Sequence, residues 1–134
     1  MSGDSRIHIA SDKDVVTARQ RGREVALHAG FSLSEAALIA TAISELARNI
    51  VTYAREGSVT LKRIQGVNGS SGLTIVAADS GPGIVDVNQA LRDGYSSSGG
   101  LGLGLPGVRR LMDEFEIASR IGIGTTVTVT KWRP

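Results

Sequence analysis

The fold is decided by residues 34–54, which read SEAALIATAISELARNIVTYA. The large apolar residues of this stretch recur at spacings of three and four, so they form one stripe along a helix: Ile39, Ile43, Leu46, Ile50 and Tyr53. Ser34 is a suitable N-cap, and Glu35 lies near the positive end of the helix. The stretch therefore predicts a helix that ends before Gly57 and packs its stripe against a sheet.

Segments on both sides of this helix predict the rest of the fold. Residues 6–10 alternate in polarity and predict an edge strand, and a helix follows from Ser11 or Asp12 to about residue 29. Later elements are a short helix, a helix that begins near Leu105 and continues through Phe115, and strands at residues 58–64, 73–79, 116–120 and 125–132. The order predicts an α/β two-layer sandwich, in which a mixed, mostly antiparallel sheet carries helices on one face.

Composition narrows the class of protein. The chain has 134 residues, which predicts one domain over residues 1–134. It has no cysteine and only two histidines, which argues against a disulfide framework and a Cys- or His-rich metal cluster. A net charge of +2 gives no broad basic surface, so nucleic acid is not an expected partner. No apolar run approaches the roughly 20 residues that span a bilayer, and the first residues lack a signal peptide's apolar segment, so we expect a cytoplasmic protein without a membrane partner.

Glu45 and Asn49 stand one turn apart on the predicted central helix, on the shoulder between its core face and solvent. A carboxylate and a carboxamide at this spacing offer hard oxygen ligands suited to Mg²⁺, or a base beside a metal ligand. The alternative is an ordinary exposed pair on a helix surface.

Two short motifs suggest contacts to a base. Asp79 ends an apolar strand and opens the run DSGPG at residues 79–83. Its carboxylate can accept the exocyclic amino proton of adenine, while Gly81 and Gly83 let the backbone approach the base, although an ordinary turn has the same composition. In the run GIGT at residues 122–125, Thr125 can hydrogen-bond near adenine, directly or through water.

A glycine-rich run, SSSGGLGLG at residues 96–104, opens directly into the helix near Leu105. Backbone N–H groups of such a run are free to hold phosphate oxygens at a helix N-terminus. The candidate phosphate contacts are Gly99, Gly100, Gly102, Leu103 and Gly104. Residues 102–107 also match G-x-G-x-x-G, but no buried strand precedes them and no acid follows about 20 residues later, so we reject a dinucleotide fold. The P-loop pattern is absent from the sequence.

Taken in order, these motifs resemble the ATP-binding fold of gyrase-type ATPases, heat-shock chaperones, histidine kinases and mismatch-repair ATPases, the GHKL or Bergerat fold. The N box is matched by ELARN at residues 45–49, and the glycine boxes by residues 79–83, 99–104 and 122–125. The resemblance covers about residues 34–130. It implies binding of ATP with Mg²⁺ under a mobile lid between residues 83 and 99.

A narrower resemblance rests on TAISELARN at residues 41–49, GGLGLGLPGVRRLMDEF at residues 99–115 and the closing KW at 131–132. These runs are similar to the small switch kinase of the bacterial stressosome, a serine/threonine kinase of the anti-sigma-factor kinase group. The resemblance implies phosphorylation of STAS-domain antagonist proteins and, after release, activation of a PP2C-type phosphatase. It also implies that Glu45 is the base, that Asn49 holds Mg²⁺, and that Asp79 reads adenine.

One position departs from the family pattern. Related anti-sigma kinases carry a lid arginine just before the second glycine box, where this chain has Gly100. The cation that neutralises the transferred phosphoryl group is therefore left open between Arg109 and Lys62. Two other functions stay open as well. One is a non-catalytic ATP-dependent binding module, such as an anti-sigma factor or phosphatase activator, in which Glu45 is dispensable. The other is a detached histidine-kinase catalytic domain, which would label a histidine.

Overall fold

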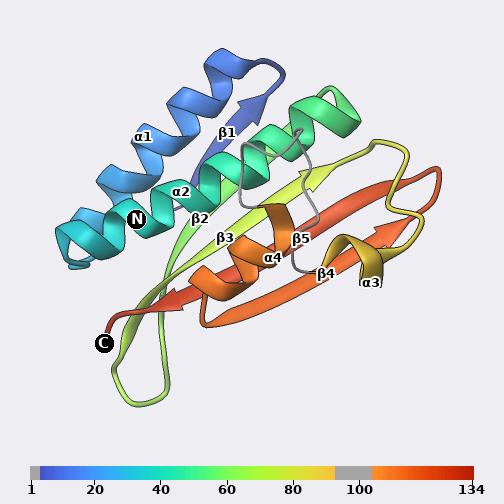
Figure 1. Ribbon diagram of the computed structural model, residues 1–134. Coiled ribbons are helices and arrows are strands. Elements are labelled where there is room, and N and C mark those ends of the chain that lie inside the picture. Colours follow the sequence, from blue (N-terminus) through green and yellow to red (C-terminus); the bar gives the residue numbers. More distant parts are fainter. Residues whose placement is uncertain (1–3, 93–103) are drawn as a thin grey trace.

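The computed structural model describes residues 4–92 and 104–134, whose strands form one five-stranded sheet (Figure 1). The strand order is β1-β2-β3-β5-β4, and all pairings between these strands are antiparallel. The strands are β1 (Ser5–Ile9), β2 (Gly57–Gln65), β3 (Ser71–Asp79), β4 (Glu114–Arg120) and β5 (Gly124–Trp132). The sheet thus consists of two hairpins joined at β3 and β5, with β1 at the edge where the sequence predicts it.

Helices cover one face of this sheet, as Figure 1 shows, and the predicted two-layer sandwich is confirmed. They are α1 (Asp12–His28), α2 (Leu33–Asn49) and α4 (Gly104–Leu111). A π-helical turn, η1 (Ile50–Ala54), continues α2, and the short α3 (Val87–Ala90) lies between β3 and α4 in the chain. Within the described ranges, no helix is long and apolar enough to cross a membrane.

The core lies between α2 and the sheet. Alternate residues of the central strands point at the helices and are buried there: Val59, Leu61, Leu73, Ile75, Val127 and Val129. Four residues of the predicted helix stripe face them and are also buried: Ile39, Ile43, Leu46 and Ile50. Each such side chain stabilises the fold by about 1.5–3 kcal/mol relative to an exposed one. The stripe therefore fixes both the position and the rotation of α2.

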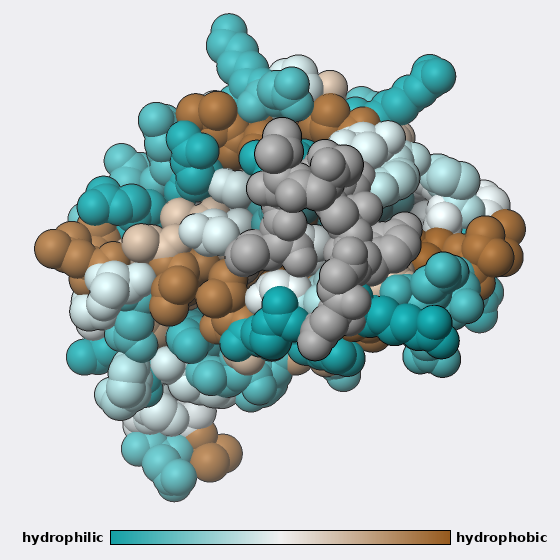
Figure 2. Space-filling view, in the orientation of Figure 1, coloured by the Kyte–Doolittle hydropathy of each residue, from teal (hydrophilic) through white to brown (hydrophobic). Residues whose placement is uncertain are grey.

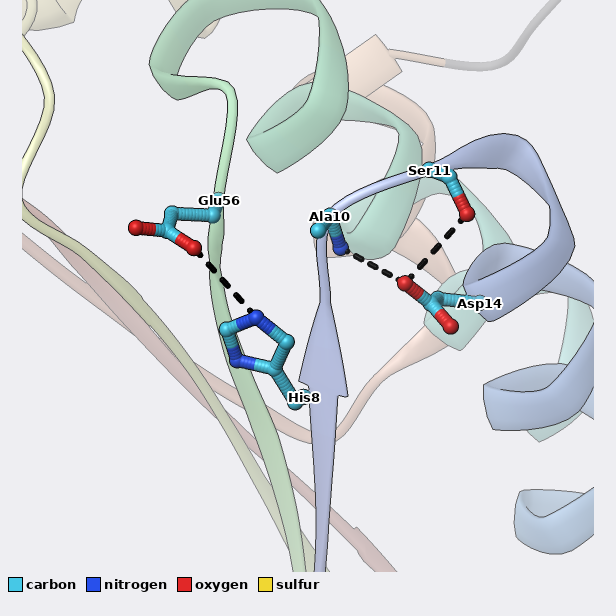
Figure 3. Close-up of polar contacts among 5 residues, drawn as sticks. All are labelled: His8, Ala10, Ser11, Asp14 and Glu56. Atoms are coloured by element: carbon cyan, nitrogen blue, oxygen red, sulfur yellow. Dashed lines mark hydrogen bonds and ion pairs between the residues drawn. The ribbon is translucent and has the colours of Figure 1, made fainter.

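Polar contacts fix the junction of β1 and α1 (Figure 3). The Oδ2 atom of Asp14 accepts hydrogen bonds from the N–H of Ala10 at 2.8 Å and from the hydroxyl of Ser11 at 3.4 Å. This carboxylate reaches back over the first turn of α1, as in a capping box. Nearby, the Nε2 atom of His8 lies 3.3 Å from the Oε2 atom of Glu56, but both side chains are exposed, so their contact adds little stability.

Two predicted details of the helices around the core are wrong. The N-cap of α2 is Ser32, whose hydroxyl oxygen accepts a hydrogen bond from the N–H of Glu35 at 3.2 Å, and Ser34 is inside the helix. Tyr53 leaves the buried stripe and is 50% exposed. It lies in η1, where i→i+5 bonding adds a residue to the turn and rotates the following side chains away from the α-helical stripe.

The last helix is also shorter than the sequence predicts. It ends at Leu111, and Phe115 lies in β4, paired with Val129 of β5. The N–H of Asp113 already donates to the carbonyl of Thr130 at 2.9 Å. Sheet pairing with β5 therefore begins before the helical spacing of the apolar residues ends.

Candidate functional site

A cavity of about 320 Å³ opens between α2 and the neighbouring ends of β3 and β5. Its wall is mostly apolar and includes Leu46, Ile50, Ala77, Leu105 and Val127. Three polar residues that the motifs predict also line it, namely Asn49, Asp79 and Thr125. Motifs that are far apart in the sequence thus meet in one apolar hollow with few polar groups, which is typical of a small-molecule site.

Asp79 is held in place at the end of β3 by two backbone donors. Its Oδ1 accepts hydrogen bonds from the N–H of Gly81 at 2.9 Å and from the N–H of Thr125 at 3.3 Å. Among residues 4–92 and 104–134, no group donates to its Oδ2. The protein therefore fixes one carboxylate oxygen and leaves the other for a donor in the cavity.

Glycines let the loop after Asp79 pack directly on the β4–β5 turn. Gly83 and Gly124 have φ values of 82° and 147°, and a Cβ at either would overlap a backbone carbonyl, of Arg120 and of Asp79 respectively. Gly83 lines the cavity. Gly81 does not, and a Cβ there would lie 2.6 Å from the Cβ of Ala54 in η1. The glycines of both motifs therefore set the position of the Asp79 carboxylate through contacts between chain segments.

Asn49, the last residue of α2, lines the cavity with a side chain that the described residues leave partly unsatisfied. Its Oδ1 is buried and has no hydrogen-bond partner there. A buried polar atom without a partner costs about 1–3 kcal/mol, so such an atom points to a ligand. The described residues hold no group of three or more His, Cys, Asp or Glu side chains that could bind a metal ion. The Asn49 oxygen therefore fits Mg²⁺ that takes its other ligands from phosphate and water.

Glu45 lies one turn before Asn49, and it is deeper than the shoulder position that the sequence predicts. It is 2% exposed and does not line the cavity, so the reading of an exposed surface pair is wrong. The Nη1 atom of Arg48 donates to its Oε2 at 3.2 Å. A buried carboxylate needs such a hydrogen-bond partner to replace the water that it loses. Sequence analysis missed Arg48, although its i,i+3 spacing from Glu45 is a signal for this ion pair.

The glycine-rich motif is described only at its last residue. Gly104 is buried and begins α4, and Pro106 lies in the first turn of this helix, where proline is tolerated. The other four candidate phosphate contacts lie outside the described residues: Gly99, Gly100, Gly102 and Leu103. In the described part, α4 packs against α2 and contributes Leu105 to the cavity wall.

The structure separates the two candidate cations. Lys62 pairs with Thr74, well away from the Asp79 end of β3, and follows the buried Leu61, so it points to the opposite face of the sheet. Arg109 lies on α4, and its Nη2 donates to the carbonyl of Leu91 at 3.5 Å. Leu91 directly follows Ala90 of the cavity wall. Lys62 is therefore excluded, and Arg109 stays a candidate.

Ser119 is a second residue that sequence analysis missed. It lies in β4, opposite Thr125 of β5. Its Oγ accepts a hydrogen bond from the N–H of Ile84 at 2.7 Å and lies 2.8 Å from the Oγ1 of Thr125. Only the register of the β4–β5 hairpin, which the turn at residues 122–124 sets, could have indicated this pair.

Comparison with known proteins gives consistent matches. A family model described as histidine kinase-like ATPase domain matches residues 9–131. The serine/threonine-protein kinase RsbT of Bacillus subtilis (strain 168) is 49% identical over 132 residues, which is 98% of each chain. An anti-sigma F factor of Caldanaerobacter subterraneus subsp. tengcongensis is 32% identical over 104 residues, covering 75% of this chain and 73% of that one.

Solved structures support the fold. The RsbU and RsbW domains of Rv1364c from Mycobacterium tuberculosis match with a TM-score of 0.61 at 23% identity, over 97% of this chain and 33% of that longer chain. Full-length ShkA in complex with AMPPNP matches with a TM-score of 0.55 at 17% identity. Because both identities are below 25%, these two matches show the arrangement of helices and strands alone.

Proposed function

This chain belongs to the family of histidine kinase-like ATPase domains and is a protein serine/threonine kinase, and from that premise we propose that it is a cytoplasmic switch kinase that acts on STAS-domain proteins. It phosphorylates serine or threonine residues of STAS-domain antagonist or scaffold proteins in a stress-signalling complex. When released from them, it binds and activates a PP2C-type phosphatase. Its similarity to RsbT along both chains and to anti-sigma F factors supports this partner-switching role.

The observation that carries the proposal is the meeting of Asp79 and Asn49 in one apolar cavity. One residue offers a carboxylate oxygen that only accepts hydrogen bonds, and the other offers a buried oxygen that has no partner among the described residues. An adenine amino group and a hard metal ion are the two ligands that such oxygens fit. A magnesium nucleotide contains both.

Each of the three polar cavity residues that the motifs predict then has one role toward the nucleotide. Asp79 accepts the amino proton of adenine through Oδ2, because Oδ1 is already engaged, and Thr125 lies beside it. The apolar wall around Ile50 and Ala77 packs against the base and excludes water. Asn49 offers Oδ1 to Mg²⁺. When bound, Mg²⁺-ATP supplies the phosphoryl group and the metal charge that offsets it.

Phosphate contacts are proposed for the glycine-rich run at residues 99–104, as its sequence suggests. Among the described residues, Arg109 lies beside the cavity wall and Arg48 holds Glu45. Either guanidinium can offset negative charge on the transferred phosphoryl group. In related kinases the lid arginine does this, and this chain has Gly100 at that position.

Glu45 is the proposed base that takes the proton of the substrate hydroxyl. Its burial excludes water, and the bond from Arg48 holds its Oε2 in one orientation. A positioned carboxylate of this kind accelerates proton transfer by about 10²–10⁴-fold. Because Glu45 and Asn49 are one helical turn apart, the base and the metal ligand are positioned by the same rigid element.

Transfer of labelled phosphate tests the proposal directly. The purified chain is incubated with Mg²⁺ and γ-labelled ATP and a STAS-domain protein, and label on the partner is followed after acid treatment. A serine or threonine ester survives acid, whereas a phosphohistidine does not. We expect acid-stable label with the wild type and a loss of at least about 100-fold in Glu45→Gln.

Glu24→Gln is the matched control, because Glu24 is exposed on α1 and remote in sequence from the site. It should transfer label at the wild-type rate. Absence of label with the wild type, or equal rates in Glu45→Gln and Glu24→Gln, would show that the catalytic part of the proposal is wrong.

The relationship to anti-sigma F factors favours one second candidate, an ATP-dependent binding module without chemistry. In that case Asp79 and Asn49 are still needed for partner binding, but Glu45 is not. Label transfer by the wild type therefore separates the two functions, because a binding module co-elutes with its partner in the presence of nucleotide but transfers no phosphate to it.

A further inference from the structure

Ser119 joins the cavity wall to the segment that follows β3. Its Oγ accepts a hydrogen bond from the N–H of Ile84 at 2.7 Å and lies 2.8 Å from the Oγ1 of Thr125. Both distances are those of well-formed hydrogen bonds. Ile84 and Thr125 line the cavity, whereas Ser119 stands behind them. Ser119 thus touches both residues without belonging to any of the sequence motifs.

The proton of Ser119 has one well-placed acceptor among the described residues. The carbonyl oxygen of Gly124 is a longer and weaker acceptor at 3.4 Å, whereas Oγ1 of Thr125, at 2.8 Å, lies at the usual O–H···O distance. The N–H of Ile84 can only donate to Ser119. These distances favour donation from Ser119 to Thr125, which leaves the hydroxyl hydrogen of Thr125 for an acceptor in the cavity.

From this order of donors we propose that Ser119 is a positioning residue that makes the Thr125 hydroxyl a hydrogen-bond donor toward the base. The inference rests on the proposed function, in which the Oδ2 of Asp79 faces the amino group of adenine. The N–H of Thr125 also donates to the Oδ1 of Asp79 at 3.3 Å, so the two side chains are held side by side. The cavity then presents an acceptor next to a donor.

Adenine matches this pair and guanine does not. The amino group of adenine donates, and the ring nitrogens N1 and N7 that flank it accept. In guanine the amino group is replaced by the acceptor O6, which would face the Asp79 carboxylate, and N1 carries a hydrogen that would face the Thr125 donor. The Asp79 carboxylate accepts from the amino group of adenine. Ser119 orients the Thr125 hydroxyl so that it donates to the neighbouring ring nitrogen.

Analogues that each lack one acceptor test this inference. Binding of Mg²⁺-ATP, 1-deaza-ATP and 7-deaza-ATP is measured by calorimetry for the wild type and for Ser119→Ala. In the wild type, the analogue that lacks the ring nitrogen contacted by the Thr125 hydroxyl should bind about 2- to 12-fold more weakly than ATP, which is the contribution of one hydrogen bond. In Ser119→Ala, ATP should weaken while that analogue does not, so the ratio of their dissociation constants falls to about one.

Two further variants separate positioning from stability. Ser119→Ala also removes the bond to Ile84, so Thr125→Val is included, which removes the donor and leaves the Ser119–Ile84 bond in place. It should show the same ratio of about one. Ser71→Ala is the matched control, because Ser71 begins β3 at the end opposite Asp79, and it should keep the wild-type ratio.

Each outcome decides one of the claims. If the wild type binds both analogues as tightly as ATP, or if Ser119→Ala or Thr125→Val keeps the wild-type ratio, Ser119 does not set the donor and the inference is overturned. If the wild type takes up no Mg²⁺-ATP at all, the proposed function itself fails, and the inference fails with it.

Discussion

Replacement of Asp79 by asparagine separates the charge of the cavity carboxylate from its shape. In the wild type, Oδ1 accepts from the N–H groups of Gly81 and Thr125. In Asp79→Asn, the carbonyl oxygen of the amide must take the Oδ1 position, because the two N–H groups need an acceptor. The amide NH₂ is thereby forced into the cavity, where it meets the amino group of adenine as a second donor.

The magnitudes follow from these contacts. A hydrogen bond to a charged acceptor contributes about 1.5–3 kcal/mol, so ATP binding should weaken by about 10- to 150-fold. The free energy of unfolding should change by less than about 1 kcal/mol, because both backbone bonds are kept. Asp79→Ala loses the oxygen that accepts both backbone hydrogen bonds and should lower the free energy of unfolding by about 1–3 kcal/mol. Binding of GTP should strengthen in Asp79→Asn, since its NH₂ can donate to O6 of guanine.

Calorimetric titration with Mg²⁺-ATP and Mg²⁺-GTP measures the affinities, and urea unfolding measures the stabilities of the same three proteins. The reasoning is refuted if Asp79→Asn binds ATP within threefold of the wild type. It is equally refuted if Asp79→Asn is destabilised as much as Asp79→Ala, since the amide would then not occupy the Oδ1 position.

Three further predictions concern single residues. Asn49→Ala should abolish the gain in nucleotide affinity that Mg²⁺ gives the wild type, measured by titration with and without EDTA, and an undiminished gain would contradict the metal role of its Oδ1. Gly124→Ala should lower the free energy of unfolding in urea by about 3 kcal/mol or more, because the added Cβ would overlap the Asp79 carbonyl. Gly122→Ala should lower it by only about 1 kcal/mol, because φ is also positive there but the added Cβ would face open space. Equal losses in the two variants would refute the contact between Gly124 and Asp79. Ser32→Ala should lower the unfolding free energy by about 1 kcal/mol and Ser34→Ala by much less, because only Ser32 caps α2, and the reverse order would contradict the cap.

The architecture could be predicted because its signals are local. The period of Ile39, Ile43, Leu46 and Ile50 requires a helix with one buried side, and the structure buries all four. The cap was readable too: Ser32 and Glu35 form the S-x-x-E pattern of a capping box, whereas Ser34 has Ala37 at the corresponding place. Choosing Ser34 overlooked a signal that the sequence contains.

Other wrong predictions, such as the continuation of the last helix to Phe115, could not be corrected from the neighbouring sequence. Leu111, Met112 and Phe115 keep helical spacing, but Phe115 pairs with Val129 in the sheet, and the carboxylate of Asp113 accepts a hydrogen bond from the N–H of Trp132 at 2.7 Å. These long-range contacts override the local period. Sequence reasoning could bring Asp79 and Thr125 into one site, and both line the same cavity. The partners that orient them come from strand register and close packing, so Ser119 became visible only in three dimensions.

The end of α2 shows why the site could not be read from helix periodicity alone. An α-helix continued past Asn49 would bury Tyr53 in the stripe, but η1 turns it outward, half exposed at the edge of the cavity. The same turn brings Ala54 against Gly81, and Gly81 donates to Asp79. π-helical turns of this kind occur frequently at functional sites. At one helix end, the chain thus combines a buried Asn49 oxygen that the described residues leave unsatisfied with an irregular turn that lines the cavity, and both features lower stability. The fully buried side chains of Ile39, Ile43 and Leu46, which precede Asn49 on the same helix, hold α2 against the sheet and offset that loss.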